Sequence, residues 1–253
     1  MNDLRAPADD VIFAMQGLVV AYGGVPVINQ LSFSVAAGQS VGLIGPNGAG
    51  KSTVVGALGG MVRPRSGHMM LAGRDLGKVS PRARVKLGMS RTFQNLEIFS
   101  SLTAVENVAC AIYGRSIARR IDRRRVREEA VEALRSVGID KYANVQAELL
   151  PYGIRKLLEL ARCFVSSPRF VVLDEPVAGL SVDEKQVIVN TIVSYCADSG
   201  AALLLIEHDM GVVQELCTEI IAIDAGEEIA HGAAGEVLND PRVIEAYLGT
   251  AIP

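Results

Sequence analysis

The segment GPNGAGKST combines glycines, a lysine and two hydroxyl residues in the spacing G-x-x-x-x-G-K-[ST]. It follows the apolar run SVGLI and precedes a helical stretch, the context in which such a loop wraps backbone N–H groups around phosphate oxygens. The predicted nucleotide-binding residues of this loop are Gly45, Pro46, Asn47, Gly48, Ala49, Gly50, Lys51, Ser52 and Thr53. We expect Lys51 to bridge the β- and γ-phosphates, Ser52 to ligate Mg²⁺ and Thr53 to reach the α-phosphate.

A second segment, FVVLDEP, ends an apolar run in two carboxylates. Carboxylates at the end of a buried strand are costly unless cations or water receive them. We expect Asp174 to hold Mg²⁺ through water, and Glu175 to polarise an attacking water as a general base. Together with the glycine-rich loop, this segment predicts hydrolysis of a nucleoside triphosphate.

A single histidine follows a third apolar run, in LLLIEHDM. An isolated histidine is most often structural or solvent-exposed. His208, however, follows a core strand as Glu175 does, so a neutral imidazole there could hydrogen-bond a γ-phosphate oxygen and sense whether it is present. We include His208 among the catalytic candidates.

The elements that must position these residues are predicted by alternating apolar runs and helical stretches. Short apolar segments over residues 11–35 predict an antiparallel hairpin, and a second hairpin is predicted around residues 224–226. The runs SVGLI, RFVVLD and AALLLIE read as buried strands. Capping boxes are predicted for Thr103 with Glu106 and for Ser181 with Glu184. From about residue 95 to 149 the chain turns helical and polar, so an α/β core is interrupted by one helical insertion.

Length and composition set limits on the class of protein. The 253 residues are 49% hydrophobic and 21% charged with a net charge of −3, which is typical of a globular protein and gives no support for nucleic-acid binding. No apolar stretch is long enough to span a bilayer, and the acidic N-terminus lacks a signal-peptide pattern, so we expect a cytoplasmic location. The four widely spaced cysteines indicate reduced core thiols, with no disulfide or metal pattern.

These segments, in this order, resemble the nucleotide-binding subunits of ABC transporters over nearly the whole chain. The resemblance implies a single domain with a P-loop NTPase core, an antiparallel β subdomain and an inserted α-helical signature subdomain. It places the core at about 11–94 and 165–253, and the helical subdomain at about 95–164. It also implies that the chain binds ATP and Mg²⁺ and couples ATP hydrolysis to the movement of a solute.

The resemblance extends to positions that the motifs above do not cover. Tyr22 in LVVAYGG resembles the aromatic residue that stacks on adenine, although a buried strand tyrosine would give the same pattern. Gln94 in SRTFQN resembles the glutamine that contacts Mg²⁺ and the attacking water. The segment AGLS, residues 178–181, takes the place of the loop that crosses between subunits, with Ser181 where that loop often has aspartate.

The segment LPYGI, residues 150–154, occupies the place of the family signature, commonly LSGGQ, which caps the γ-phosphate of ATP on the opposite subunit. Pro151 stands where the signature has serine and Tyr152 where it has its first glycine, so the donating hydroxyl is missing. Gly153 and a helix N-terminus remain and still offer backbone N–H groups. The resemblance therefore implies that Pro151, Tyr152 and Gly153 form a weakened cap on the nucleotide of a second subunit.

The tyrosine before the signature glycine resembles the ATPases of branched-chain amino acid uptake, in particular the G-type subunit of the leucine/isoleucine/valine system. The segments RTFQNLEIFSSLTAVENV, LELARC, DEPVAGL and EHDM favour the same branch, while urea, short-amide and lipopolysaccharide transporters share much of the pattern. The resemblance implies permease subunits, a second ATPase subunit in a homodimer or heterodimer, indirectly a solute-binding protein, and a peripheral place on the cytoplasmic face of the inner membrane. A soluble non-transport ABC ATPase and a regulatory nucleotide binder are the alternatives.

Two further segments have both a functional and a structural interpretation. Ile98, Phe99 and Leu102 in LEIFSSL could form a docking groove for the permease or the ordinary core of the helical subdomain. A basic run could face solvent or attract anionic lipid headgroups, and the acidic balance of the chain disfavours nucleic acid there. The run consists of Arg119, Arg120, Arg123, Arg124, Arg125 and Arg127.

Overall fold

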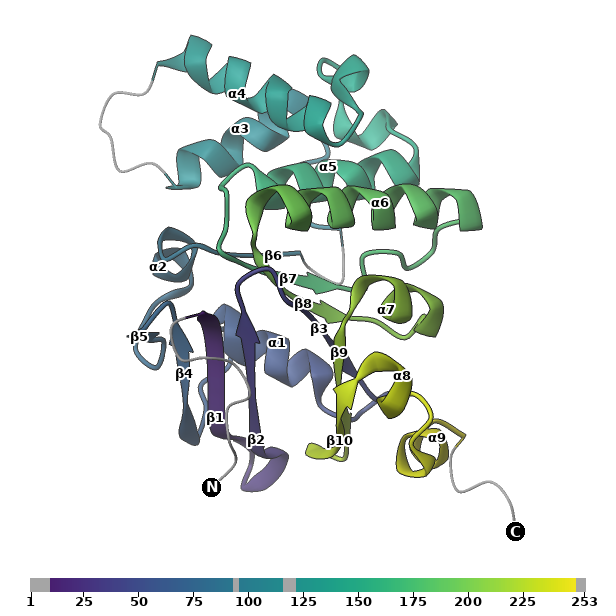
Figure 1. Ribbon diagram of the computed structural model, residues 1–253. Helices are drawn as coiled ribbons and strands as arrows, with labels where there is room; N and C mark the ends of the chain where they lie inside the picture. The colour runs from purple at the N-terminus through teal and green to yellow at the C-terminus, as the bar shows by residue number, and fades with distance from the viewer. Residues whose placement is uncertain (1–9, 93–95, 116–121, 249–253) are drawn as a thin grey trace.

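The computed structural model describes residues 10–92, 96–115 and 122–248, whose strands form two sheets flanked by helices (Figure 1). The first sheet is antiparallel, with the order β2-β1-β4-β5. Its strands are β1 (Val11–Tyr22), β2 (Val25–Ala36), β4 (Ser66–Leu71) and β5 (Arg74–Asp75). The predicted N-terminal hairpin is confirmed, since β1 pairs with β2 and the pair closes at Tyr22 and Val25.

The central sheet has the order β10-β9-β3-β8-β7-β6. Its strands are β3 (Ser40–Ile44), β6 (Met89–Arg91), β7 (Phe170–Asp174), β8 (Ala202–Ile206), β9 (Glu219–Asp224) and β10 (Glu227–Ala233). The five strands from β9 to β6 run parallel, whereas β10 returns antiparallel to β9 and forms the second predicted hairpin. Strands β7 and β8 are buried along their whole length, as the continuous apolar runs predict.

The α-helices lie between and after these strands, and some of them begin at the capping signals seen in the sequence. Their bounds are α1 (Lys51–Gly59), α2 (Pro81–Lys86), α3 (Ala104–Arg115), α4 (Arg123–Ser136), α5 (Tyr152–Phe164), α6 (Val182–Ser199), α7 (Met210–Leu216), α8 (Ala234–Val237) and α9 (Pro241–Leu248). Short 3₁₀ turns cover Asp140–Tyr142 and Ala147–Leu149. Both predicted capping boxes are present, at the start of α3 and of α6. Ser80 is the N-cap of α2 but makes no side-chain capping bond, so Pro81 and the backbone begin that helix.

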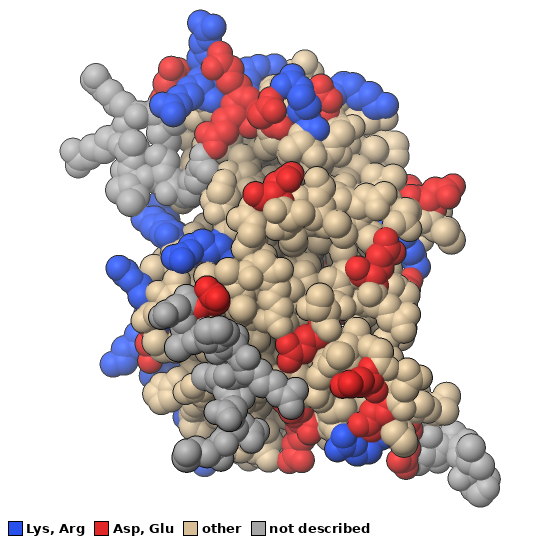
Figure 2. Space-filling model, viewed as in Figure 1, with Lys and Arg blue, Asp and Glu red and all other residues tan. Residues whose placement is uncertain are grey.

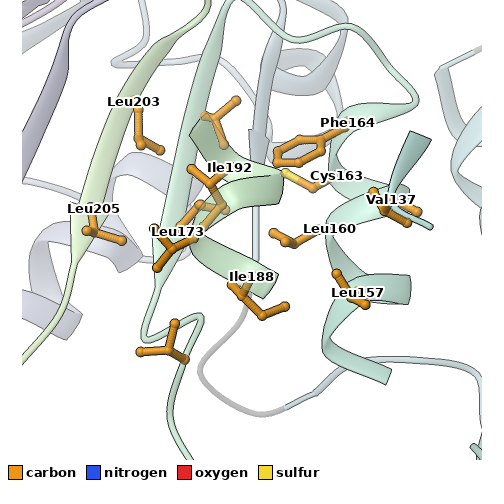
Figure 3. Packing of buried hydrophobic residues seen from close by; sticks show 14 of the residues in the cluster. Val137, Leu157, Leu160, Cys163, Phe164, Leu173, Ile188, Ile192, Leu203 and Leu205 are labelled. Carbon is orange, nitrogen blue, oxygen red and sulfur yellow. The ribbon is translucent and has the colours of Figure 1, made fainter. Parts of the chain in front are cut away.

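Two buried clusters lie on the two faces of the central sheet, because alternate strand residues point to opposite faces. On one face the sheet packs against the first sheet and α1. On the other face it packs against the long helices. Figure 3 shows this second cluster, in which side chains of α5 and α6 meet over β7 and β8. Its labelled residues include Leu157, Leu160, Phe164, Ile188, Ile192, Leu173, Leu203 and Leu205.

The segment before α3 contains one residue that packs in the core and one that is exposed, so it fits both interpretations, subdomain core and docking surface, in part. Ile98 packs against the core, whereas Phe99 is 49% exposed and its backbone is bound on both sides by the buried side chain of Asn107. Asn107 Oδ1 accepts from the Phe99 N–H at 2.8 Å, and its Nδ2 donates to the Phe99 carbonyl at 3.0 Å. The fold thus holds an aromatic ring at the surface at this point.

The arginines at the start of α4 form a solvated helix face. Arg123, Arg124, Arg125 and Arg127 are exposed, and Arg124 Nε pairs with Glu128 Oε1 at 2.9 Å. Figure 2 shows positive and negative side chains intermixed where α4 lies at the top of the molecule. Arg119 and Arg120 lie outside the described residues.

The cysteines and the apolarity of the helices complete the description of the fold. All four cysteines are free; Cys163 and Cys217 are buried as predicted for core thiols, whereas Cys110 and Cys196 are only partly buried. Within residues 10–92, 96–115 and 122–248, no helix combines the length and apolarity needed to cross a membrane.

Candidate active site

The register of the central sheet brings three chemical segments to one edge. Ile206, the last residue of β8, pairs with Leu43 of β3 on one side and with Asp174 of β7 on the other. The loops that follow these three parallel strands therefore start side by side. They carry the glycine-rich loop, the two carboxylates and His208.

The glycine-rich loop fits between the two sheets only because it has no side chain at two points. A Cβ on Gly45 would lie 2.1 Å from the Ile223 carbonyl oxygen of β9. Gly50 has φ +105°, and a Cβ there would lie 2.6 Å from Ile28 Cδ1 and 2.9 Å from the Val27 carbonyl oxygen of β2. The loop is therefore held between β2 and β9, and it leads into α1.

Lys51 in the first turn of α1 points back over the loop. Its Nζ donates to the carbonyl oxygens of Gly45 at 2.6 Å and Pro46 at 3.0 Å. Burial lowers the pKa of Lys51, while the negative charges of Glu175 and Asp174 oppose that effect. The N-cap, Gly50, has no side chain to cap the helix, so the positive end of α1 faces the same loop. Ser52 is exposed and Thr53 half-buried in this turn.

Asp174 is a buried carboxylate, 7% exposed, at the end of β7. Burial and then the neighbouring charge of Glu175 raise the pKa of Asp174 to about 6, against the opposing effect of Arg91 and Lys51. The Asp174 backbone N–H donates to Thr92 Oγ1 at 3.0 Å. Sequence reasoning did not identify Thr92 or Arg91, although both belong to the segment SRTFQN that contains Gln94.

Glu175 adopts a strained backbone conformation at the first position after β7. Its φ is +49°, in the left-handed region that non-glycine residues rarely occupy. The Glu175 N–H donates to the Ile206 carbonyl at 2.9 Å, which holds the residue against β8. Its Oε1 lies 3.9 Å from His208 Nδ1. The predicted pair of catalytic side chains thus lies together at the sheet edge.

Glu207, a buried glutamate that sequence reasoning missed, binds the backbone next to Glu175 and next to His208. The side chain of Glu207 has no exposed surface. Its Oε2 accepts from the N–H groups of His208 at 2.9 Å and Asp209 at 3.3 Å, and its Oε1 accepts from the Val177 N–H at 3.3 Å. The His208 side chain is 62% exposed, so a fixed backbone carries an accessible imidazole. A carboxylate directly after the apolar run of LLLIEHDM was the available signal.

Tyr22 lies at the closed end of the β1–β2 hairpin, near the point where β2 meets the glycine-rich loop. It is 53% exposed, so the alternative of a buried strand tyrosine is wrong. Tyr22 pairs with Val25, and Val27 and Ile28, a little further along β2, lie where a Cβ on Gly50 would meet them. Gln94 lies outside the described residues, and its role stays a prediction.

The residues predicted to form a cap, Pro151, Tyr152 and Gly153, lie at the start of α5 against the loop that follows Glu175. Pro151 is the exposed N-cap. The Tyr152 hydroxyl donates to the Ala178 carbonyl at 3.3 Å. Gly153 is buried, and a Cβ there would lie 2.6 Å from Glu184 Oε1. Within one chain, this end of α5 is therefore in contact with the segment between β7 and α6.

The residues at the sheet edge fit a magnesium-bound nucleotide. Lys51 and the amide end of α1 suit phosphate oxygens, and the buried Asp174 with its raised pKa is a carboxylate that a cation would stabilise. In the described part of the chain, no group of three or more His, Cys, Asp or Glu side chains could hold a metal ion alone. The Asp174 carboxylate and the Ser52 hydroxyl are oxygen donors, and these suit Mg²⁺, which is bound through one or two protein oxygens, water and substrate phosphates.

Comparisons with known proteins agree with this geometry. Residues 28–178 match the sequence profile of ABC transporters, and residues 227–252 match that of branched-chain amino acid ATP-binding cassette transporters. The chain is 35% identical to the high-affinity branched-chain amino acid transport ATP-binding protein BraF of Pseudomonas aeruginosa and to LivG of Salmonella typhimurium, each over 95% of this chain and 98% of the relative. A crystal structure of the ADP conformation of an ATP-binding cassette of an ABC transporter, 26% identical, superimposes with a TM-score of 0.85 over 94% of this chain and 99% of that one. This chain belongs to the ABC transporter family.

Proposed function

We propose that this chain is the ATP-binding and ATP-hydrolysing subunit of an importer of branched-chain or other hydrophobic amino acids. The observation that carries the enzymatic part is the meeting of Lys51, Asp174 and Glu175 at one edge of the central sheet. The choice of solute is supported by the relatives, which are branched-chain amino acid transport proteins, and by the profile match over residues 227–252.

The loop and α1 would bind the triphosphate. Lys51 would exchange its two carbonyl partners for phosphate oxygens, and the amide groups at the start of α1 would donate to the same phosphates. Ser52 would ligate Mg²⁺ directly and Asp174 through water, with Gln94 as a further contact. Bound Mg²⁺ supplies neutralisation of the phosphate charge. Thr53 would reach the α-phosphate, and the exposed ring of Tyr22 would stack on adenine.

Glu175 and His208 would carry out the proton and positioning steps. Glu175 would accept the proton of the attacking water, because its carboxylate lies at the sheet edge beside the loop. His208 would donate a hydrogen bond to the γ-phosphate, and Glu207 holds its backbone in place for that contact. The two side chains lie 3.9 Å apart, so one water or phosphate oxygen can contact both.

The partners in this proposal are a second ATPase subunit, permease subunits and, through them, a solute-binding protein. In the two-subunit state, Pro151, Tyr152 and Gly153 would present the N-terminus of α5 to the nucleotide of the other subunit. The helical subdomain, about residues 95–164, would contact the permease through the exposed ring of Phe99. We propose that the chain acts at the cytoplasmic face of the inner membrane, as a peripheral subunit.

The enzymatic part is tested by phosphate release from Glu175→Gln. The amide keeps the shape of the side chain but cannot accept the proton, so release should fall about a hundredfold or more while ATP binding stays within about twofold of wild type. Glu128→Gln on the exposed face of α4 is the matched control and should leave both quantities unchanged. Equal release from wild type and Glu175→Gln would contradict hydrolysis at this site and support a regulatory nucleotide binder.

The solute is tested with the chain reconstituted in vesicles together with the permease subunits that co-purify with it and a solute-binding protein. We expect ATP-dependent uptake of leucine, isoleucine or valine. Uptake of urea or short amides without leucine uptake would overturn the assignment of the solute while leaving the ATPase assignment in place.

A further inference from the structure

Two residues of α5, one helical turn apart, bind the two ends of the segment that contains Glu175. Lys156 Nζ donates to the Glu175 carbonyl at 3.3 Å. The Tyr152 hydroxyl donates to the Ala178 carbonyl, also at 3.3 Å. Side chains at i and i+4 share one helix face, so α5 contacts residues 175–178 with a single face.

The burial of Lys156 indicates that it does more than fill space. Lys156 is 2% exposed, although an ammonium group in the interior is costly unless hydrogen bonds and charges compensate it. Its Nζ lies 6.0 Å from the centre of the Tyr152 ring, within reach of a cation–π interaction. A methionine would pack in the same place without that cost, so the donated hydrogen bond is what the lysine adds.

The segment that Lys156 contacts needs support from several sides. Glu175 has φ +49°, a conformation that persists only where surrounding bonds hold it. On the side of β8, the Ile206 carbonyl accepts from the Glu175 N–H and Glu207 accepts from the Val177 N–H. On the side of α5, Lys156 binds the Glu175 carbonyl, which also accepts from the Ala178 N–H at 3.3 Å.

We infer that Lys156, together with Tyr152, is a positioning residue that fixes the turn at residues 175–178 and thereby orients the carboxylate of Glu175. The inference rests on the proposed function, because it requires Glu175 to act on the attacking water. It also gives the tyrosine of LPYGI a role within its own chain. Because Tyr152 and Lys156 stand one turn apart on the same helix, a displacement of the first turn of α5 would change both contacts with residues 175–178.

The test compares Lys156→Met and Tyr152→Phe with Lys141→Met as control. Lys141 is an exposed lysine whose Nζ also lies over a tyrosine ring, 5.1 Å from the centre of Tyr142, so the control removes a similar contact far from Glu175 in sequence. We expect kcat to fall about tenfold to a hundredfold in Lys156→Met and a few-fold in Tyr152→Phe, because the base is displaced. The KM for ATP should stay within about twofold, since the phosphate loop is not altered.

A second readout needs neither nucleotide nor hydrolysis. In the nucleotide-free protein, amide hydrogen exchange at residues 177–180 should be about tenfold faster in Lys156→Met than in wild type, with no change over residues 45–58. Wild-type kcat together with wild-type exchange in Lys156→Met would overturn the inference. Faster exchange over residues 45–58 as well would also overturn it, since the lysine would then be a general packing residue.

The design separates this inference from the proposed function. Absence of phosphate release from the wild type contradicts the proposed function, and amide exchange alone then decides whether Lys156 fixes the turn. If Lys156→Met does not fold, Tyr152→Phe decides, because it removes only one hydroxyl. In that case, an unchanged kcat and unchanged exchange at Ala178 in Tyr152→Phe would overturn the inference.

Discussion

Replacing Asp174 by asparagine should make the nucleotide-free protein more stable while removing its magnesium-dependent activity. Asp174 is buried, and its pKa of about 6 lies about two pH units above the ordinary value of 3.8. The folded protein therefore binds the proton of Asp174 more tightly than the unfolded chain does. Ionisation of Asp174 therefore destabilises the folded protein. The contribution of Asp174 to the free energy of unfolding is highest below about pH 4 and falls as the pH rises through 6.

The magnitude follows from the two pKa values. Each pH unit of difference corresponds to about 1.4 kcal/mol, so the ionised carboxylate costs about 3 kcal/mol at pH 8 and about 1 kcal/mol at pH 4.5. Asparagine keeps the size of the side chain without the charge, and Asp174→Asn should be more stable by about those amounts. In a chain of this size, 3 kcal/mol corresponds to a rise in Tm of roughly 6–12 °C.

The assay is thermal unfolding in EDTA at pH 8 and pH 4.5, with Asp198→Asn on the exposed surface of α6 as control. Chelation keeps Mg²⁺ away from Asp174, so the comparison reports only its ionisation. A gain in stability that is equal at both pH values, or no gain at pH 8, would refute the argument from burial. In a parallel assay, Asp174→Asn should show no magnesium-dependent phosphate release, because the neutral side chain no longer attracts the cation.

Two further predictions concern residues that hold the phosphate loop and its helix. Arg84 is buried and donates to the carbonyls of Ala57, Leu58, Leu76 and Val79. Arg84→Ala leaves these carbonyls without the guanidinium donor and should lower the free energy of unfolding by about 3 kcal/mol. The exposed Arg82→Ala is the control in the same unfolding experiment. A loss below about 1 kcal/mol in Arg84→Ala would mean that water replaces the guanidinium. Tyr247→Phe removes the hydroxyl oxygen that accepts a hydrogen bond from the Gly45 N–H at 2.7 Å. We expect ATP affinity, measured by titrating the protein with ATP, to fall threefold to tenfold. Tyr113→Phe on α3 is the control and should leave the affinity unchanged. An unchanged affinity in Tyr247→Phe would show that α9 does not support the loop.

The parts of the fold that were predicted from the sequence are those that local physics determines. The buried strands appear as continuous apolar runs, because a parallel strand covered on both faces has no solvent side. The start of α6 follows from Ser181 and Glu184, which satisfy each other's backbone within three residues. The glycine-rich loop follows from its spacing, since two of its glycines allow approaches that a Cβ would block.

The parts that were missed depend on contacts between residues far apart in the chain. Thr92 lies 82 positions before Asp174, and their contact exists because β6 pairs with β7. Arg84 lies in a short helix rich in basic residues, where an arginine is expected to be exposed. It is buried instead, and it donates to carbonyl groups at the C-terminal end of α1. Lys156 is the strongest case, because a lysine on a helix is exposed by default and only the packing of α5 shows that it is buried.

Gly153 shows how the structure changes the meaning of a motif. In the sequence it is the glycine that the signature keeps, so an aspartate there would seem to act on the phosphate of a second subunit. A Cβ at this position, however, would lie 2.6 Å from Glu184 Oε1, and the Glu184 Oε2 accepts from Ser181 to complete the cap of α6. Gly153→Asp would bring the new carboxylate close to that of Glu184. The repulsion would push the Glu184 side chain away from the N-terminus of α6 in the same chain. Because the same loop leads back to Glu175, loss of hydrolysis in Gly153→Asp would not by itself report on a second subunit. The proposed cap on a partner's nucleotide is therefore better probed at Pro151, which is exposed and where a larger side chain meets solvent first.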